Sequence, residues 1–146
     1  MNIQKYKIQL IKEKSIKYEI VDKYVNTPDA ANNIVRPILE SEPEEVCILL
    51  TLNTKGKVTG VSEISRGSIN ASIVHPREVF KRALLMNAAS IIVAHNHPSG
   101  DPTPSQEDIS LTKRLSEAGH ILGIEVNDHI VIGDAKYASL KVSNLF

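Results

Sequence analysis

The sequence is poor in cysteine, in aromatic residues and in long apolar runs. Cys47 is the only cysteine, and aromatic residues make up 4% of the chain. A single cysteine excludes a disulfide within the chain and favours a reducing, cytoplasmic location. No run of about 20 apolar residues is present, and Met1–Lys5 do not open a signal-peptide core, so we expect no membrane span and no export.

The chain also has no excess of charge of either sign. Its 17 Lys and Arg residues balance 17 Asp and Glu residues. Such a balance provides no global field to attract nucleic acid, and few aromatic side chains are available to stack on bases. We therefore expect no nucleic-acid partner, and we interpret the basic residues Arg77, Lys81 and Arg82 as a solvated helix face.

What is present fits one domain of 146 residues with a core of its own, in which Cys47 is a buried thiol. Punctuation by Pro and Gly and the hydrophobic periodicity predict an alternation of helices and strands. The expected elements are a charged hairpin or extended arm over 1–26, a helix begun by Thr27-Pro28-Asp29 and ending near Pro43, a hairpin of strands 46–52 and 57–64, a helix from Pro76 to about Ala89, a strand over 90–94, a helix from Pro104 to about Ala118 stopped by Gly119, and one or two strands within 121–132.

The candidate functional residues begin at the end of the strand expected over 90–94. His95 and His97 follow that strand and are two residues apart. Side chains at i and i+2 of a strand share a face, so the two imidazoles are expected side by side. Imidazole is the commonest metal ligand at neutral pH, and this pair therefore predicts a metal site.

The next helix adds a hydroxyl and a carboxylate to the pair. Thr103 as N-cap, Pro104 at the first helical position and Gln106 form a capping box, which leaves the hydroxyl of Ser105 free; Ser105 itself is the alternative cap. Asp108 precedes Leu111 and Leu115 by three and seven residues, which turns its carboxylate to the apolar face of the helix. A buried carboxylate needs a partner, and the two histidines provide the reason for a metal there.

The pattern His95-x-His97-x7-Ser105-x2-Asp108 resembles the JAMM signature of the JAB/MPN metalloprotease superfamily. Together with the segments 74–80 and 128–133, it is most similar to the RadC-like branch of that superfamily. The resemblance covers Thr27 to the C-terminus and implies a mixed α/β JAB/MPN domain over 27–146. That domain has a central mixed sheet flanked by helices, in a cytidine-deaminase-like architecture.

The resemblance also implies a Zn²⁺ ion and hydrolysis of peptide or isopeptide bonds in a peptide or protein substrate. His95, His97 and Asp108 are then the metal ligands, and Ser105 stabilises the oxyanion. The family places a glutamate on an earlier strand as general base, and Glu63 matches that position. Glu78 is the alternative, but as a first-turn carboxylate it is explained by the helix dipole.

Asp101 and Asp128 could support the metal ligands, although loop capping explains Asp101 equally well.

Other functions compete with the hydrolase. A JAB-fold interaction module without chemistry is one rival. A DNA-repair-associated factor is another, which rests on the family label alone. A zinc deaminase needs a Pro-Cys-x-x-Cys element that one cysteine cannot supply.

Overall fold

The computed structural model describes residues 1–15, 23–68 and 74–146. Its elements, in chain order, are α1 (Pro28–Leu39), β1 (Val46–Leu52), β2 (Val58–Arg66), α2 (Pro76–Leu85), β3 (Ser90–Asn96), α3 (Gln106–Leu122), β4 (Glu125–Ile132) and β5 (Tyr137–Ser139). The five strands form one sheet in the order β2-β1-β3-β4-β5, in which β3 and β4 are parallel and all other neighbours are antiparallel. The prediction of a mixed α/β fold with a central mixed sheet is confirmed.

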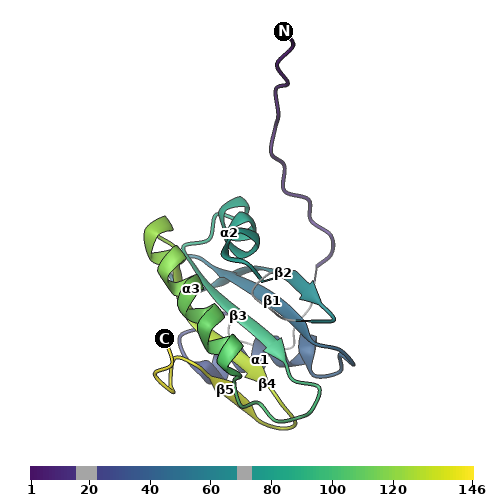
Figure 1. Cartoon of the computed structure of the whole chain (residues 1–146), viewed down its shortest axis with the longest axis vertical. Coiled ribbons are helices and arrows are strands. Elements are labelled where there is room, and N and C mark those ends of the chain that lie inside the picture. Colours follow the sequence, from purple (N-terminus) through teal and green to yellow (C-terminus); the bar gives the residue numbers. More distant parts are fainter. Residues whose placement is uncertain (16–22, 69–73) are drawn as a thin grey trace.

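The sheet is covered on both faces, with α1 on one and with α2 and α3 on the other (Figure 1). β1 is buried along its whole length because it lies inside the sheet between β2 and β3. Its residues alternate between two cores. Val46, Ile48, Leu50 and Leu52 pack on the α1 face, whereas Cys47 and Leu49 pack on the α2/α3 face. Cys47 is thus the buried thiol that the sequence predicts.

Several helix boundaries differ from the predicted ones for local reasons. α1 begins at its predicted N-cap, Thr27, but ends at Leu39, before Pro43. α2 ends at Leu85, four residues earlier than expected, since Asn87 adopts a left-handed backbone with φ 53°. Gly119 does not stop α3, which continues to Leu122 and is capped by Gly123 at φ 73°.

The N-terminal residues 1–15 contain neither helix nor strand and extend away from the body (Figure 1). The second strand of the predicted hairpin, over 16–21, lies outside the described residues, so the division at residue 26 stays a prediction. Among the described helices, none combines the length and the apolar character that crossing a membrane demands.

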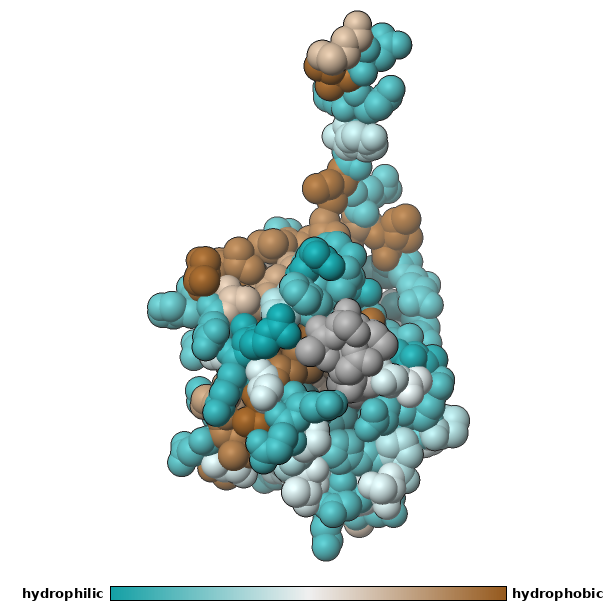
Figure 2. Space-filling model, viewed as in Figure 1, coloured by the Kyte–Doolittle hydropathy of each residue, from teal (hydrophilic) through white to brown (hydrophobic). Residues whose placement is uncertain are grey.

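The visible surface of the body is mostly hydrophilic (Figure 2). Hydrophobic residues gather toward α2 and the C-terminal end of α3, where Leu84, Ile121 and Leu122 are exposed.

Candidate metal centre

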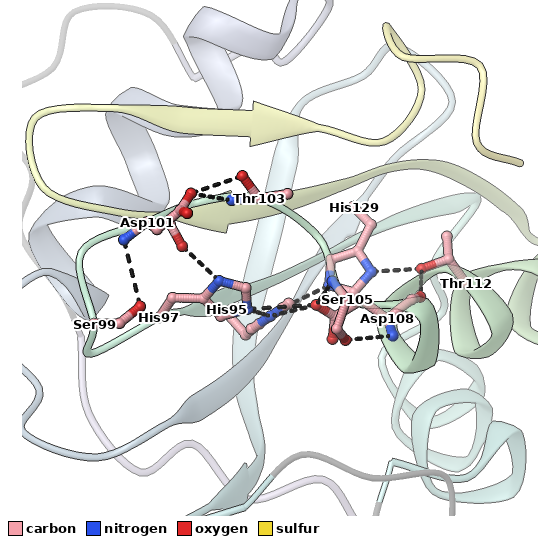
Figure 3. A network of polar contacts seen from close by, with 9 residues as sticks. All are labelled: His95, His97, Ser99, Asp101, Thr103, Ser105, Asp108, Thr112 and His129. Atoms are coloured by element: carbon pink, nitrogen blue, oxygen red, sulfur yellow. Dashed lines mark hydrogen bonds and ion pairs between the residues drawn. The ribbon is translucent and has the colours of Figure 1, made fainter.

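The C-terminal end of β3 brings His95 and His97 together. His95 is completely buried and pairs across the sheet with Cys47, so its ring lies on the α2/α3 face. His97 follows the last strand residue, and its backbone N–H donates to the carbonyl of Ile132 at 2.8 Å. The two Nε2 atoms are 3.0 Å apart (Figure 3). The expected juxtaposition of the imidazoles is therefore present.

The first turn of α3 adds the carboxylate. Asp108 is buried, with 5% of its surface exposed, and its Oδ2 lies 3.5 Å from Nε2 of His95 and 3.4 Å from Nε2 of His97. The three donor atoms lie within 4.8 Å of one another, close enough to hold one metal ion. The predicted inward direction of Asp108 is confirmed.

The cap of this helix differs from the predicted one. Ser105 is the N-cap, with its Oγ accepting the N–H of Asp108 at 3.0 Å, and Asp108 Oδ2 accepts the N–H of Ser105 at 2.9 Å. Thr103 lies in the preceding loop instead, where its N–H and hydroxyl both donate to the carboxylate of Asp101. The capping box thus fixes the carboxylate oxygen that faces the histidines. The hydroxyl proton of Ser105 is not used by this box and can still be donated.

Each imidazole is also held on its far side. Nδ1 of His97 lies 2.7 Å from the carbonyl oxygen of Asp101, and Nδ1 of His95 lies 2.8 Å from Nε2 of His129. His129 was not among the predicted site residues, although an imidazole inside an apolar strand was a usable signal. Asp101 supports the site through its backbone, while its side chain caps its own loop.

Asp128 does not support a ligand directly. Its carboxylate accepts hydrogen bonds from the backbone N–H of His129, the hydroxyl of Ser139 and the backbone N–H of Lys141. It therefore fixes the C-terminal turn against β4. Burial raises the pKa of Asp128, and these three hydrogen bonds oppose that rise.

The electrostatics of the donor set favour positive charge between its members. Burial by itself would raise the pKa of Asp108, but hydrogen bonding to His95 and His97 lowers it well below its usual range. The same carboxylate raises the pKa of His97 through its hydrogen bond, against the effect of burial. A carboxylate that stays ionised and two converging imidazole nitrogens are suited to a proton or to a metal cation.

The structure does not bring Glu63 to this group. Glu63 pairs with Ile48, whose side chain belongs to the α1 face, whereas His95 lies on the opposite face. The Glu63 carboxylate accepts hydrogen bonds from Arg66 at 3.1 and 2.6 Å. Arg66 also binds Glu42, so Glu63 belongs to an exposed ion-pair cluster.

Glu78 is also occupied elsewhere. Its carboxylate forms ion pairs with Lys81 at 2.7 Å and Arg82 at 3.2 Å along α2. These hydrogen bonds lower the pKa of Glu78.

Glu45 is another carboxylate near this group, and the sequence did not indicate it. It directly precedes β1 and is half-buried, and its carbonyl continues the ladder by accepting the N–H of Gly67 at 2.8 Å. Alternation along the strand puts Glu45 on the same face as Cys47 and His95. Its charge contributes to the raised pKa of His97, after the larger effect of Asp108. The sequence could have indicated this position only if the pairing of β1 with β3 had been known.

The fold and the group formed by His95, His97 and Asp108 agree with one known protein family. A family model described as "RadC-like JAB domain" matches residues 25–145. The chain belongs to this family.

The similar proteins have names that state no activity. A UPF0758 protein of Moorella thermoacetica is 64% identical over 96 residues, which cover 66% of this chain and 42% of that protein. One of Alkaliphilus oremlandii is 47% identical over 138 residues, which cover 94% of this chain and 60% of that protein. One of Desulforudis audaxviator is 52% identical over 122 residues, with 84% and 53% covered. The chain spans about half the length of these relatives.

Proposed function

We propose that this domain is a zinc-dependent hydrolase that cleaves amide bonds, as peptide or isopeptide bonds, in a peptide or protein substrate. The observation that carries the proposal is the convergence of His95 Nε2, His97 Nε2 and Asp108 Oδ2 within 4.8 Å of one another. A fold by itself does not define an activity, so the argument depends on this donor set and its surroundings.

The donor set fits a catalytic zinc site. Two imidazole nitrogens and one carboxylate oxygen are a known three-ligand set for hydrolytic zinc, with one position left for water or substrate. Both imidazoles are hydrogen-bonded at Nδ1, which leaves Nε2 as the donor toward the metal. A zinc ion held there would supply Lewis acidity toward a water molecule and the scissile carbonyl.

The protein's own residues would then handle protons and charge. Glu45 would take a proton from the attacking water and pass it to the leaving amine. Its position beside β1 on the face of His95, and its electrostatic influence on His97, support this role over that of Glu63. Ser105, whose Oγ accepts from Asp108 N–H, retains its hydroxyl proton to donate to the developing oxyanion.

The metal site is tested by alanine substitutions of its three ligands. His95→Ala, His97→Ala and Asp108→Ala should each lose most of the bound zinc, since each removes one of three protein ligands. His120→Ala, which changes an exposed histidine near the end of α3, is the matched control and should retain it. Elemental analysis after dialysis gives the zinc content. Full zinc occupancy in all three ligand variants would end the proposal.

Hydrolysis is tested separately with the zinc-loaded protein and a library of peptides and isopeptide-linked peptides. Cleavage should stop on addition of a chelator and return on addition of zinc. A protein that holds zinc at these residues but cuts no member of the library would favour the interaction-module alternative.

A further inference from the structure

A buried chain of hydrogen bonds runs from the backbone of α3 to the far side of His95 (Figure 3). The hydroxyl of Thr112 donates to the carbonyl oxygen of Asp108 at 2.6 Å, and its Oγ1 lies 2.6 Å from Nδ1 of His129. Nε2 of His129 lies 2.8 Å from Nδ1 of His95. Thr112, His129 and His95 are all completely buried, so water does not compete for these contacts.

The positions of the protons in this chain follow from its fixed end. A carbonyl oxygen only accepts, so the single hydroxyl proton of Thr112 is committed to Asp108. The Thr112 oxygen must then accept a proton from Nδ1 of His129. A neutral His129 with its proton on Nδ1 has only a lone pair on Nε2, and His95 must donate from Nδ1. A neutral His95 therefore keeps the lone pair of Nε2 for the metal.

His97 reaches the same state by a different route. Its Nδ1 faces the carbonyl oxygen of Asp101 at 2.7 Å and must donate to it, so the neutral ring has its lone pair on Nε2. The support of His97 is thus a backbone group, whereas the support of His95 consists of two side chains that substitution can remove.

We propose that His129 and Thr112 are positioning residues that hold His95 in the Nδ1–H tautomer, with Nε2 ready to bind the metal before the metal arrives. The inference rests on the metal site of the proposed function. It goes beyond that function by assigning a role to two residues outside the group of three donors. The hydrogen-bond chain begins at the carbonyl oxygen of Asp108 in α3. The same turn of this helix therefore orients both Asp108 and His95.

The direct test is ¹⁵N nuclear magnetic resonance of histidine rings in the metal-free wild-type protein at neutral pH. His129 and His95 should both show the neutral Nδ1–H tautomer, and His120 should show the Nε2–H-rich mixture of an exposed imidazole. His129 as the Nε2–H tautomer or as an imidazolium would overturn the proposal. This measurement needs no variant, so it stands even where a substitution prevents folding.

Paired variants test the consequence for metal binding. Thr112→Val keeps the shape of the side chain but removes the hydroxyl, and Thr112→Ser keeps the hydroxyl. Zinc affinity, measured by competition with a chromophoric chelator, should fall by about 10- to 100-fold in Thr112→Val and in His129→Leu, as for other groups that support metal ligands. Thr112→Ser should rescue most of the affinity.

The outcomes separate this inference from the proposed function. Equal zinc affinity in wild type and Thr112→Val, with His95 in the same tautomer, would show a merely structural threonine and overturn the inference alone. A wild-type protein that binds no zinc would overturn the proposed function, while the ring spectra would still decide the tautomers.

Discussion

At the residue scale, each of the three side chains of the candidate metal centre is fixed by a second contact. Asp101 holds His97, His129 holds His95, and the N–H of Ser105 holds Asp108. A donor side chain that is already held by a second hydrogen bond loses little further freedom when a metal binds, which is what a preorganised site requires. The supporting groups are as much part of the site as the donors.

The placement of the carboxylates gives a prediction about the general base. Glu45→Gln keeps the size of the side chain but cannot accept a proton at neutral pH. It should leave zinc content unchanged and lower kcat/KM by about 10²- to 10⁴-fold, the usual share of acid–base catalysis. Cleavage rates of any peptide that the wild type cuts, together with zinc analysis, provide the measurement.

Glu63→Gln and Glu78→Gln serve as the comparison in that experiment. Both carboxylates form exposed ion pairs, which contribute little to stability, so both variants should stay folded and active. An inactive Glu63→Gln beside an active Glu45→Gln would return the role to the carboxylate on β2.

At the element scale, the register of β1 decides which side chains meet. Because Cys47 pairs with His95, residues two apart on β1 share the face of the metal centre, and Ile48 with its partner Glu63 lies on the other face. A shift of one residue would exchange the two sets. The capping box of α3 has a comparable effect, since its two reciprocal hydrogen bonds set the helix start and the direction of Asp108.

The same helix provides a prediction about Gly119. Alanine is normally the better helix residue by about 1 kcal/mol, but a Cβ at position 119 would lie 2.3 Å from the carbonyl oxygen of Ile124 and 3.1 Å from Cζ of Phe80. Gly119→Ala should therefore destabilise the protein, by about 1 to 3 kcal/mol as for other overpacked cores. Glu117→Ala, exposed in the same part of α3, is the control. Urea unfolding of both variants decides it, and a Gly119→Ala more stable than wild type would contradict the packing at this position.

At the scale of the whole molecule, the metal centre lies where three chain segments end or begin beside one another. His95 lies at the C-terminal end of β3 and Asp108 in the first turn of α3, and Glu45 is the residue before β1. The two cores on either side of the sheet hold these ends in place. The balanced net charge still argues against a nucleic-acid ligand, and that expectation stays a prediction.

Stability of the metal-free molecule should fall on acidification because of His129. Burial, followed by the charge of neighbouring His95, lowers the pKa of His129 to about 3 from an ordinary value of 6.5. The unfolded chain therefore takes up a proton below pH 6.5 that the folded chain does not. The contribution of neutral His129 to the free energy of unfolding is complete above pH 6.5. It is lost as the pH falls toward 3, and the free energy changes by at most about 1.4 kcal/mol per pH unit.

His97 and Asp108 change the stability of the folded state in other pH ranges. The raised pKa of His97 stabilises the folded state below pH 6.5, and this contribution is lost as the pH rises through the folded value. The lowered pKa of Asp108 adds to acid lability only below pH 3.8. Urea unfolding of metal-free wild type and His129→Gln at several pH values from 7.5 to 4 isolates the part due to His129. Equal slopes in the two proteins would contradict the assignment.

The sequence by itself determined the mixed α/β fold, most of the elements and the donor set. His95, His97 and Asp108 were predictable because strand and helix periodicities are local, and because a motif of this length specifies both. The cap of α3 was harder to predict, since Thr103 and Ser105 are both competent caps. In the structure Ser105 is the cap, and Thr103 is held in the preceding loop by its two hydrogen bonds to the carboxylate of Asp101.

Only the tertiary structure decided what surrounds the donors. His129 is 34 residues from His95 in the chain, and Glu45 directly precedes β1, whereas the expected Glu63 lies on β2. Both placements depend on which strands are neighbours and in what register they pair, and no local pattern contains that information. Cross-strand pairing brings distant residues to one face of the sheet, and the metal centre takes its supporting groups from that face.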